Sequence, residues 1–156
     1  MKPFDEKHYV PVLYTKAGER DALKELDSAT KAGLTPLLVV HPISWDFEKD
    51  APEKTIDQHL SKLPGELLKS WGTRAAFVDA VHIESEVMGS GIHPVEWLVD
   101  ETAALGLELV PVVSPDHSSD YIDAVNNLVS AGKSSEIALR LTVAHWPVAP
   151  TASRID

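Results

Sequence analysis

Short apolar runs alternate with amphipathic stretches along this chain, and the alternation predicts its fold. We expect five strands, near residues 9–15, 34–41, 74–83, 107–114 and 136–143. Between these runs the apolar positions recur every three or four residues, which is the period of an amphipathic helix. Alternating strands and helices predict an α/β domain with a parallel sheet.

Local signals mark where some of the helices begin and end. A helix is predicted over residues 17–32, with Gly33 as its left-handed stop. The pair Thr55 and Gln58 has the spacing of a capping box, which predicts the start of a later helix. We expect Pro64-Gly65 to interrupt that later helix.

Five strands with four helices make up about half of an eight-stranded barrel. We therefore expect one α/β domain over residues 1–156, built as half of a TIM-barrel-like fold, with a tail over residues 144–156. The alternative is a flavodoxin-like, five-stranded doubly wound sheet, which suits the length of the chain. In a half-barrel both edge strands lack a partner, so we expect a partner protein or a second copy to complete the sheet.

The composition excludes several kinds of partner and chemistry. The net charge is −10, with no basic cluster, so we expect no nucleic-acid partner. The absence of cysteine excludes disulfides, thiolate catalysis and cysteine-ligated metals. The first residues lack a signal-peptide pattern, and no apolar run approaches the roughly 20 residues of a membrane helix. We expect a cytoplasmic protein without membrane contact.

Candidate binding residues follow the predicted strands. In parallel α/β folds, the carboxyl ends of the strands and the loops that leave them form the ligand-binding face. Lys16 ends the first strand, Glu19 lies in the next turn, and His82 lies at the end of the third strand. We expect a weakly polar crevice with one cationic focus, suited to a small anion, beside the long loop over residues 45–53.

Histidines near strand ends raise the question of a metal site. His41, His82 and His117 lie at or after the ends of three strands, and Glu84 is close to His82 in sequence. Three histidines brought together would form a zinc-type ligand set. Scattered histidines of this kind are common, however, so we expect no metal and no cofactor, and we assign no catalytic residue.

Two charged residues interrupt apolar strands. Asp79 lies in the third strand and Arg140 in the fifth. Side-chain alternation turns Arg140 to the inner face of the sheet and Leu139 to the helix-packed face. Because a buried charge needs a partner, we expect Arg140 to pair with a carboxylate, Asp79 first and Glu84 second. The pair would either close the barrel as an internal salt bridge or hold an anionic ligand.

The segment over residues 9–23 combines a strand of the form Y-x-P-x-L with K-x-G-E and then A-L in the first helix. Within it, Lys16, Gly18 and Glu19 are the K, G and E of the motif. Further matching stretches are Thr35-Pro36-Leu37, Asp46-Phe47-Glu48, Trp71-Gly72-Thr73-Arg74 and the strand that contains Arg140. In this combination the chain resembles the phage "beta protein" family over most of its length.

This resemblance implies a cytosolic protein of prophages and mobile elements, associated with phage-defence loci. It also implies a barrel-like α/β fold of about twice this length. It carries no established reaction, and therefore no catalytic residues.

Two function classes stay open. The first is a component of a phage-encoded or anti-phage defence or toxin–antitoxin-like system that acts through protein–protein contact. The second is a barrel-type enzyme that acts on a small anionic substrate at the carboxyl face of the strands. The lack of a recognisable acid–base or nucleophile motif favours the first class.

Overall fold

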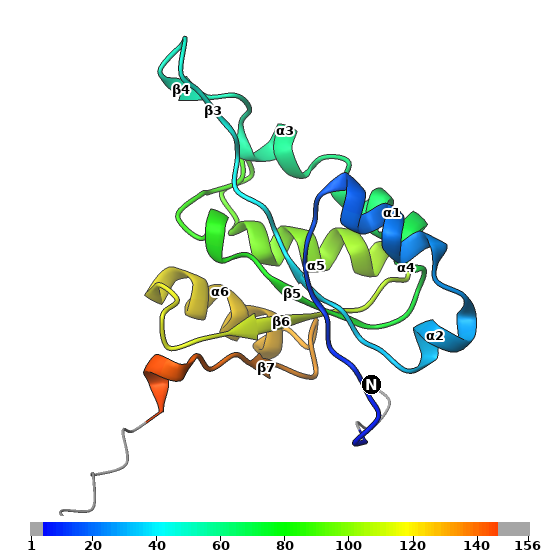
Figure 1. Ribbon diagram of the computed structural model, residues 1–156. Helices are drawn as coiled ribbons and strands as arrows, with labels where there is room; N and C mark the ends of the chain where they lie inside the picture. The colour runs from blue at the N-terminus through cyan, green and yellow to red at the C-terminus, as the bar shows by residue number, and fades with distance from the viewer. Residues whose placement is uncertain (1–4, 147–156) are drawn as a thin grey trace, which may run out of the picture.

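Five short strands form one parallel sheet in the order β1-β2-β5-β6-β7 (Figure 1). The computed structural model describes residues 5–146. The strands are β1 (Val12–Tyr14), β2 (Leu37–Val39), β5 (Ala76–Asp79), β6 (Leu109–Val113) and β7 (Ala138–Leu139). Each of them lies inside one of the predicted strand ranges, and the parallel α/β class is confirmed.

Six helices and one hairpin connect these strands. The helices are α1 (Ala17–Glu25), α2 (Ser28–Ala32), α3 (Ile56–Leu60), α4 (Leu63–Trp71), α5 (Pro94–Ala104) and α6 (Ser119–Ser130), with 3-10 turns at Val81–Ile83 and Val143–His145. The long loop after β2 folds into an antiparallel hairpin of β3 (Trp45–Asp46) and β4 (Ala51–Pro52), which projects from the body (Figure 1). No helix within residues 5–146 has the length and apolar character needed to cross a membrane.

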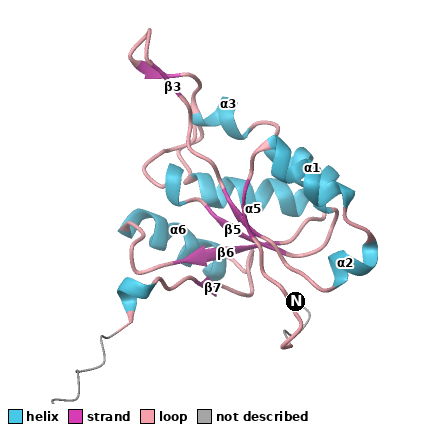
Figure 2. Ribbon diagram, viewed as in Figure 1, coloured by secondary structure: helices cyan, strands magenta, loops and turns pink. Residues whose placement is uncertain are grey.

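The strand order favours the half-barrel description. Each strand of the sheet lies beside the strand that follows it in the chain, and right-handed crossovers then place all the helices on one face. The helices contact one another in the order α1, α4, α5, α6, and Figure 2 shows α1, α5 and α6 following one another across the molecule. A doubly wound, flavodoxin-like sheet instead reverses its order at a switch point and carries helices on both faces.

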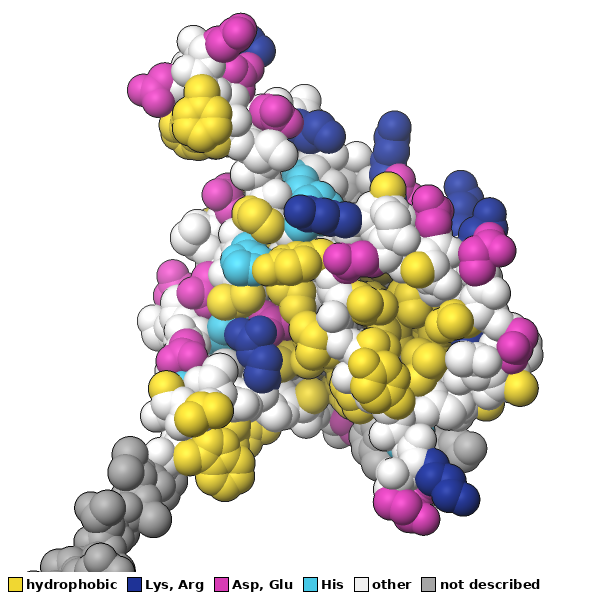
Figure 3. Space-filling model, viewed as in Figure 1, with side chains coloured by type: hydrophobic (Ala, Val, Ile, Leu, Met, Phe, Trp, Pro, Cys, Tyr) yellow, Lys and Arg dark blue, Asp and Glu magenta, His cyan; other side chains and the backbone are white. Residues whose placement is uncertain are grey.

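Both faces of the sheet are apolar. The helix-packed face holds the main core, which includes Leu38, Val40, Val78 and Leu109 from the strands and Leu23, Leu67, Trp71, Leu98 and Val125 from the helices. The opposite, inner face holds a second cluster formed by Leu37, Val39, Phe77, Val110 and Val112. Hydrophobic side chains also gather at the centre of the molecule in Figure 3. The three central strands, β2, β5 and β6, are buried on both sides, which explains their nearly continuous apolar runs in the sequence.

The helix predicted over residues 17–32 is in fact two helices. Leu26 is extended and ends α1, and the Asp27 side chain then caps α2 by accepting a hydrogen bond of 2.8 Å from the Thr30 amide. Aspartate favours such caps because its carboxylate competes for nearby backbone N–H groups. Gly33 has a φ of −95°, so the predicted left-handed stop is wrong. A left-handed glycine does follow another helix, α5, at Gly106, where φ is 82°.

The Thr55 capping box is confirmed, with the Gln58 amide donating to the Thr55 hydroxyl at 3.3 Å and the Thr55 amide donating to the Gln58 side chain at 3.1 Å. The predicted interruption of the helix lies before Pro64-Gly65 and not at these two residues. Helix α3 ends at Leu60, and Pro64 lies in the first turn of α4. Proline is tolerated there because first-turn N–H groups have no partner within the helix.

One face of the edge strand β7 is packed as predicted, and the other face is exposed. Ala138 packs with the inner cluster, as side-chain alternation requires. Leu139 was expected on the helix-packed face, but it is 64% exposed. Only the 3-10 turn Val143–His145 follows β7 within the described residues, and no α-helix covers that side. Ile137 and Leu141 are exposed for the same reason, and residues 147–156 of the predicted tail lie outside the described range.

Candidate functional site

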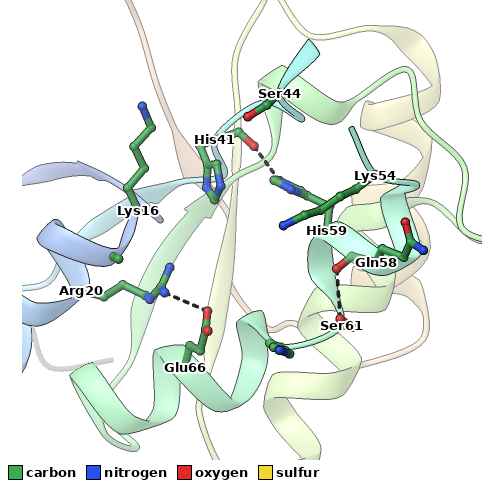
Figure 4. Close-up of a pocket in the computed structure, with 11 residues that line it drawn as sticks. Lys16, Arg20, His41, Ser44, Lys54, Gln58, His59, Ser61 and Glu66 are labelled. Carbon is green, nitrogen blue, oxygen red and sulfur yellow. Dashed lines mark hydrogen bonds and ion pairs between the residues drawn. The ribbon is translucent and has the colours of Figure 1, made fainter. Parts of the chain in front are cut away.

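A cavity of about 810 Å³ lies at the carboxyl ends of β1 and β2, next to α3 and the base of the hairpin (Figure 4). We call it the basic pocket. Its walls are formed by Lys16, Ala17, Arg20, His41, Ser44, Lys54, Gln58, His59, Ser61, Lys62 and Glu66. The pocket therefore occupies the edge at which parallel α/β folds bind their ligands.

The charges around the basic pocket are mostly of one sign. Four cationic side chains, Lys16, Arg20, Lys54 and Lys62, line the pocket together with a single carboxylate, Glu66. Arg20 and Glu66 neutralise each other, because their side chains lie 2.9 Å apart. The three lysines have no ion pair within residues 5–146. The sequence predicted one cationic focus at Lys16, and Lys54 and Lys62 line the same pocket.

Two different segments carry these cations. Lys16 immediately precedes α1, and no side chain caps the first turn of that helix, so its amide groups stay available beside Ala17. Lys54 comes from the opposite side, where the hairpin segment returns to the body before α3 (Figure 4). Arg20 is held in place by donating to the Thr15 carbonyl. The pocket therefore depends on the long segment between β2 and α4, which supplies its second wall.

Two histidines form the floor between these walls. His41 Nδ1 lies 2.8 Å from the Thr15 hydroxyl, and the His41 carbonyl accepts a hydrogen bond of 2.9 Å from His59 Nε2. The two imidazole rings meet edge to face, with their centroids 4.6 Å apart. Burial lowers the pKa of His41 below its usual value, and the neighbouring His59, Lys16, Arg20 and Lys54 lower it further. His41 is therefore neutral at pH 7.

A second polar group lies on the inner face of the sheet, around the fully buried carboxylate of Asp79. Arg140 Nη1 lies 2.9 Å from Asp79 Oδ2, and His117 Nε2 lies 3.3 Å from Asp79 Oδ1. The Val81 amide donates to the same Oδ1 at 2.9 Å. The predicted pairing of Arg140 with Asp79 is confirmed.

The backbone decides the tautomer of His117. The Ser114 amide donates to His117 Nδ1 at 3.1 Å, so the proton of the neutral ring is on Nε2 and points to Asp79. The contact between Arg140 and Asp79 is close but poorly aligned. As a result Asp79 Oδ2 and Arg140 Nε are both buried without a hydrogen-bond partner. Burial also raises the pKa of the adjacent Tyr121 phenol, which donates to the Val112 carbonyl.

The five predicted binding residues do not form one site. Lys16 lines the basic pocket, whereas Asp79 and Arg140 belong to the inner-face group. Glu19 lies in the first turn of α1, with one carboxylate oxygen buried and without a hydrogen-bond partner. His82 is exposed and stacks on Tyr14, with their ring centroids 5.8 Å apart.

Sequence reasoning missed the basic residues around α3. Lys54, His59 and Lys62 all line the basic pocket, and they lie close together in the chain after the hairpin. Their clustering was the available signal, but these residues form a site only because the segment after the hairpin returns to the carboxyl ends of β1 and β2. Within residues 5–146 no group of three or more histidine, aspartate or glutamate side chains is arranged to hold a metal ion.

A family model described as Beta protein matches residues 9–154 of the chain. A search of curated proteins and a search of solved structures gave no match. The family description names no reaction.

Proposed function

We propose that this chain, which belongs to the Beta protein family, binds a small anionic molecule in the basic pocket. The observation that carries the proposal is that Lys16, Lys54 and Lys62 all line one cavity and form no ion pair within residues 5–146, with the Lys16 ammonium 5.6 Å from the centroid of the Tyr14 ring. An anion bound in the cavity would be attracted by all three ammonium groups.

The neutral groups of the pocket suit the same ligand. Ser44 places a hydroxyl donor and Gln58 an amide donor among the lysines, whereas the Ser61 hydroxyl already donates to the Gln58 carbonyl at 3.0 Å. The uncapped first turn of α1 adds backbone N–H groups and the positive end of a helix dipole. Since the net charge of −10 repels anions at long range, recognition depends on these short-range contacts.

The fuller form of the proposal is a barrel-type enzyme that acts on the bound molecule. His41 and His59 are the candidates for acid–base roles, because both line the pocket and touch each other. Histidine is suited to proton transfer near neutral pH. The Asp79 group lies on the inner face, and its residues do not line the basic pocket.

The proposal is tested by stabilisation with inorganic phosphate, because a ligand that binds only the folded state raises the melting temperature. At constant ionic strength we expect phosphate to stabilise the wild type. Lys54→Met should lose most of this effect. Lys69→Met is the matched control, because Lys69 is an exposed lysine outside the pocket. Equal stabilisation of both variants would contradict the proposal.

A second candidate function is contact with a partner protein or a second copy that completes the sheet. Its support is the exposure of large apolar side chains at both edges, where Val12 and Leu139 are each 64% exposed. Exposed apolar edges of this kind are typical of interfaces. Light scattering should then show a particle heavier than one chain, and Leu139→Lys should reduce its mass. A wild-type monomer would contradict this candidate.

A role in a phage-encoded or anti-phage defence or toxin–antitoxin-like system is our proposal for the biological setting. It rests on the family resemblance and is independent of the pocket geometry. A phage challenge of cells that express the protein tests it, with Lys16→Ala in the basic pocket and Glu19→Ala in the first turn of α1 as the variants. Loss of protection in folded variants would support the role, and unchanged phage growth with the wild-type gene present or deleted would contradict it.

A further inference from the structure

We infer that the ligand of the basic pocket carries a compact dianionic group of the phosphate or sulfate type, and that His41 gains a proton when this group binds. The inference rests on the anion-binding function proposed above and deepens it. It names the chemical class of the ligand and a proton that accompanies it.

The charge balance of the pocket favours a dianion. Glu66 already neutralises Arg20, so the excess positive charge comes from Lys16, Lys54 and Lys62. A single carboxylate would leave most of that excess unmatched. A tetrahedral dianion can instead accept hydrogen bonds from several directions at once, which suits donors that approach from both walls of the cavity.

His41 lies where a bound dianion would change its charge state. The charged and titratable groups around it are Lys16 and Arg20 on the α1 side and Lys54 and His59 on the α3 side. All of these groups are cationic or neutral. In the empty pocket they and burial hold the pKa of His41 low, so the ring carries no second proton. A dianion placed among the same groups reverses the sign of the local field and favours the imidazolium.

The hydrogen bonds of His41 allow this change without rearrangement. Its Nδ1 shares a hydrogen bond of 2.8 Å with the Thr15 hydroxyl, which can act either as donor or as acceptor. In the imidazolium form, Nδ1–H donates to Thr15 and Nε2–H becomes a charged donor for the ligand. Thr15 is completely buried and its hydroxyl also accepts from the His41 amide, so the ring is held in place.

The test is calorimetric titration with inorganic sulfate, whose charge does not change between pH 5 and pH 8. Any proton that is taken up when sulfate binds must therefore be taken up by the protein. Measurements at pH 7 in buffers of different ionisation enthalpy count these protons. We expect uptake of up to one proton by the wild type, and sulfate affinity that rises by up to about tenfold per pH unit as the pH falls.

Two variants and one further anion complete the experiment. His41→Gln should bind sulfate without proton uptake. His82→Gln, the control at an exposed histidine outside the pocket, should behave like the wild type. Acetate, a monoanion, should bind at least about tenfold more weakly than sulfate at equal ionic strength. If His41→Gln does not fold, the titration of the His41 ring protons by NMR in the wild type, with and without sulfate, decides the question.

The outcomes separate this inference from the proposed function. Sulfate binding without proton uptake, or uptake that persists in His41→Gln, overturns the role of His41 and leaves anion binding intact. Acetate binding as tightly as sulfate overturns the dianion assignment alone. Failure of sulfate, phosphate and acetate to bind overturns the proposed function as well.

Discussion

The guanidinium of Arg140 lies 2.9 Å from the carboxylate of Asp79 and joins two strands that are not neighbours in the sheet. Arg140 directly follows β7 and Asp79 ends β5, so the contact passes over β6 on the inner face. The Asp79 side chain is fully buried, and it also accepts from His117 and from the Val81 amide. This contact holds the edge strand β7 against the rest of the sheet.

Removing the arginine should destabilise the fold. Arg140→Ala leaves the Asp79 charge buried without its cation, and breaking such a pair costs about 3–5 kcal/mol. Because the Arg140 side chain is 29% exposed, we expect a loss near the low end of that range. Urea denaturation measures the change in the free energy of unfolding.

The matched control is the double variant Asp79→Asn with Arg140→Ala. It removes both charges, and the asparagine oxygen can still accept from the Val81 amide. We expect it to be more stable than Arg140→Ala alone. A loss of well under about 1 kcal/mol in Arg140→Ala, as at an ordinary surface position, would show that the pair does not hold the sheet together.

Local patterns predicted the parts of the structure that local physics controls. The five strands and the Thr55 capping box are determined by neighbouring residues, and each is present. The pairing of Arg140 with Asp79 was also predictable, because two charges in apolar strands of one sheet have few other partners.

Other parts depended on tertiary contacts. The break between α1 and α2 arises because Asp27 caps a new helix within a stretch that otherwise has a helical period. Leu139 has the alternation of a covered strand, but its cover depends on a helix that the described chain does not contain. The basic pocket depends on the path of the hairpin segment, which brings Lys54 and Lys62 towards Lys16.

The stability of the protein should fall in mild acid through His93. Its Nδ1 accepts the Val95 amide at the start of α5, and its Nε2 donates to the Glu84 carbonyl. Burial lowers the pKa of His93 below its ordinary value of 6.5. The unfolded chain therefore takes up a proton first as the pH falls, and stability decreases from about pH 6.5 downwards.

His93→Asn tests this assignment. Asparagine can still cap α5 through its side-chain oxygen, but it does not titrate. Between pH 7.5 and pH 5.5 we expect the urea midpoint of the variant to fall less than that of the wild type, with a residual fall from His41. An identical fall in the two proteins would contradict the role given to His93.

Neutralising the one carboxylate of the basic pocket should strengthen anion binding. Glu66→Gln removes the partner of Arg20 and leaves the guanidinium free for the ligand. Because the Glu66 side chain is 39% exposed, we expect a modest gain of about two- to fivefold in sulfate affinity. Glu101→Gln makes the same change in net charge at an exposed position outside the pocket. An equal gain in both variants would mean that only the net charge matters.

The measurement that tests the central claim most directly is a sulfate titration followed by the backbone amide signals of the labelled protein at constant ionic strength. Binding in the basic pocket predicts the largest shifts at Ala17 and Arg20 and across residues 54–62. The amides around Arg140 on the inner face should move little. Saturable shifts centred on Arg140, or no saturable shift at any amide, would contradict the claim that this chain binds an anion at the carboxyl edge of β1 and β2.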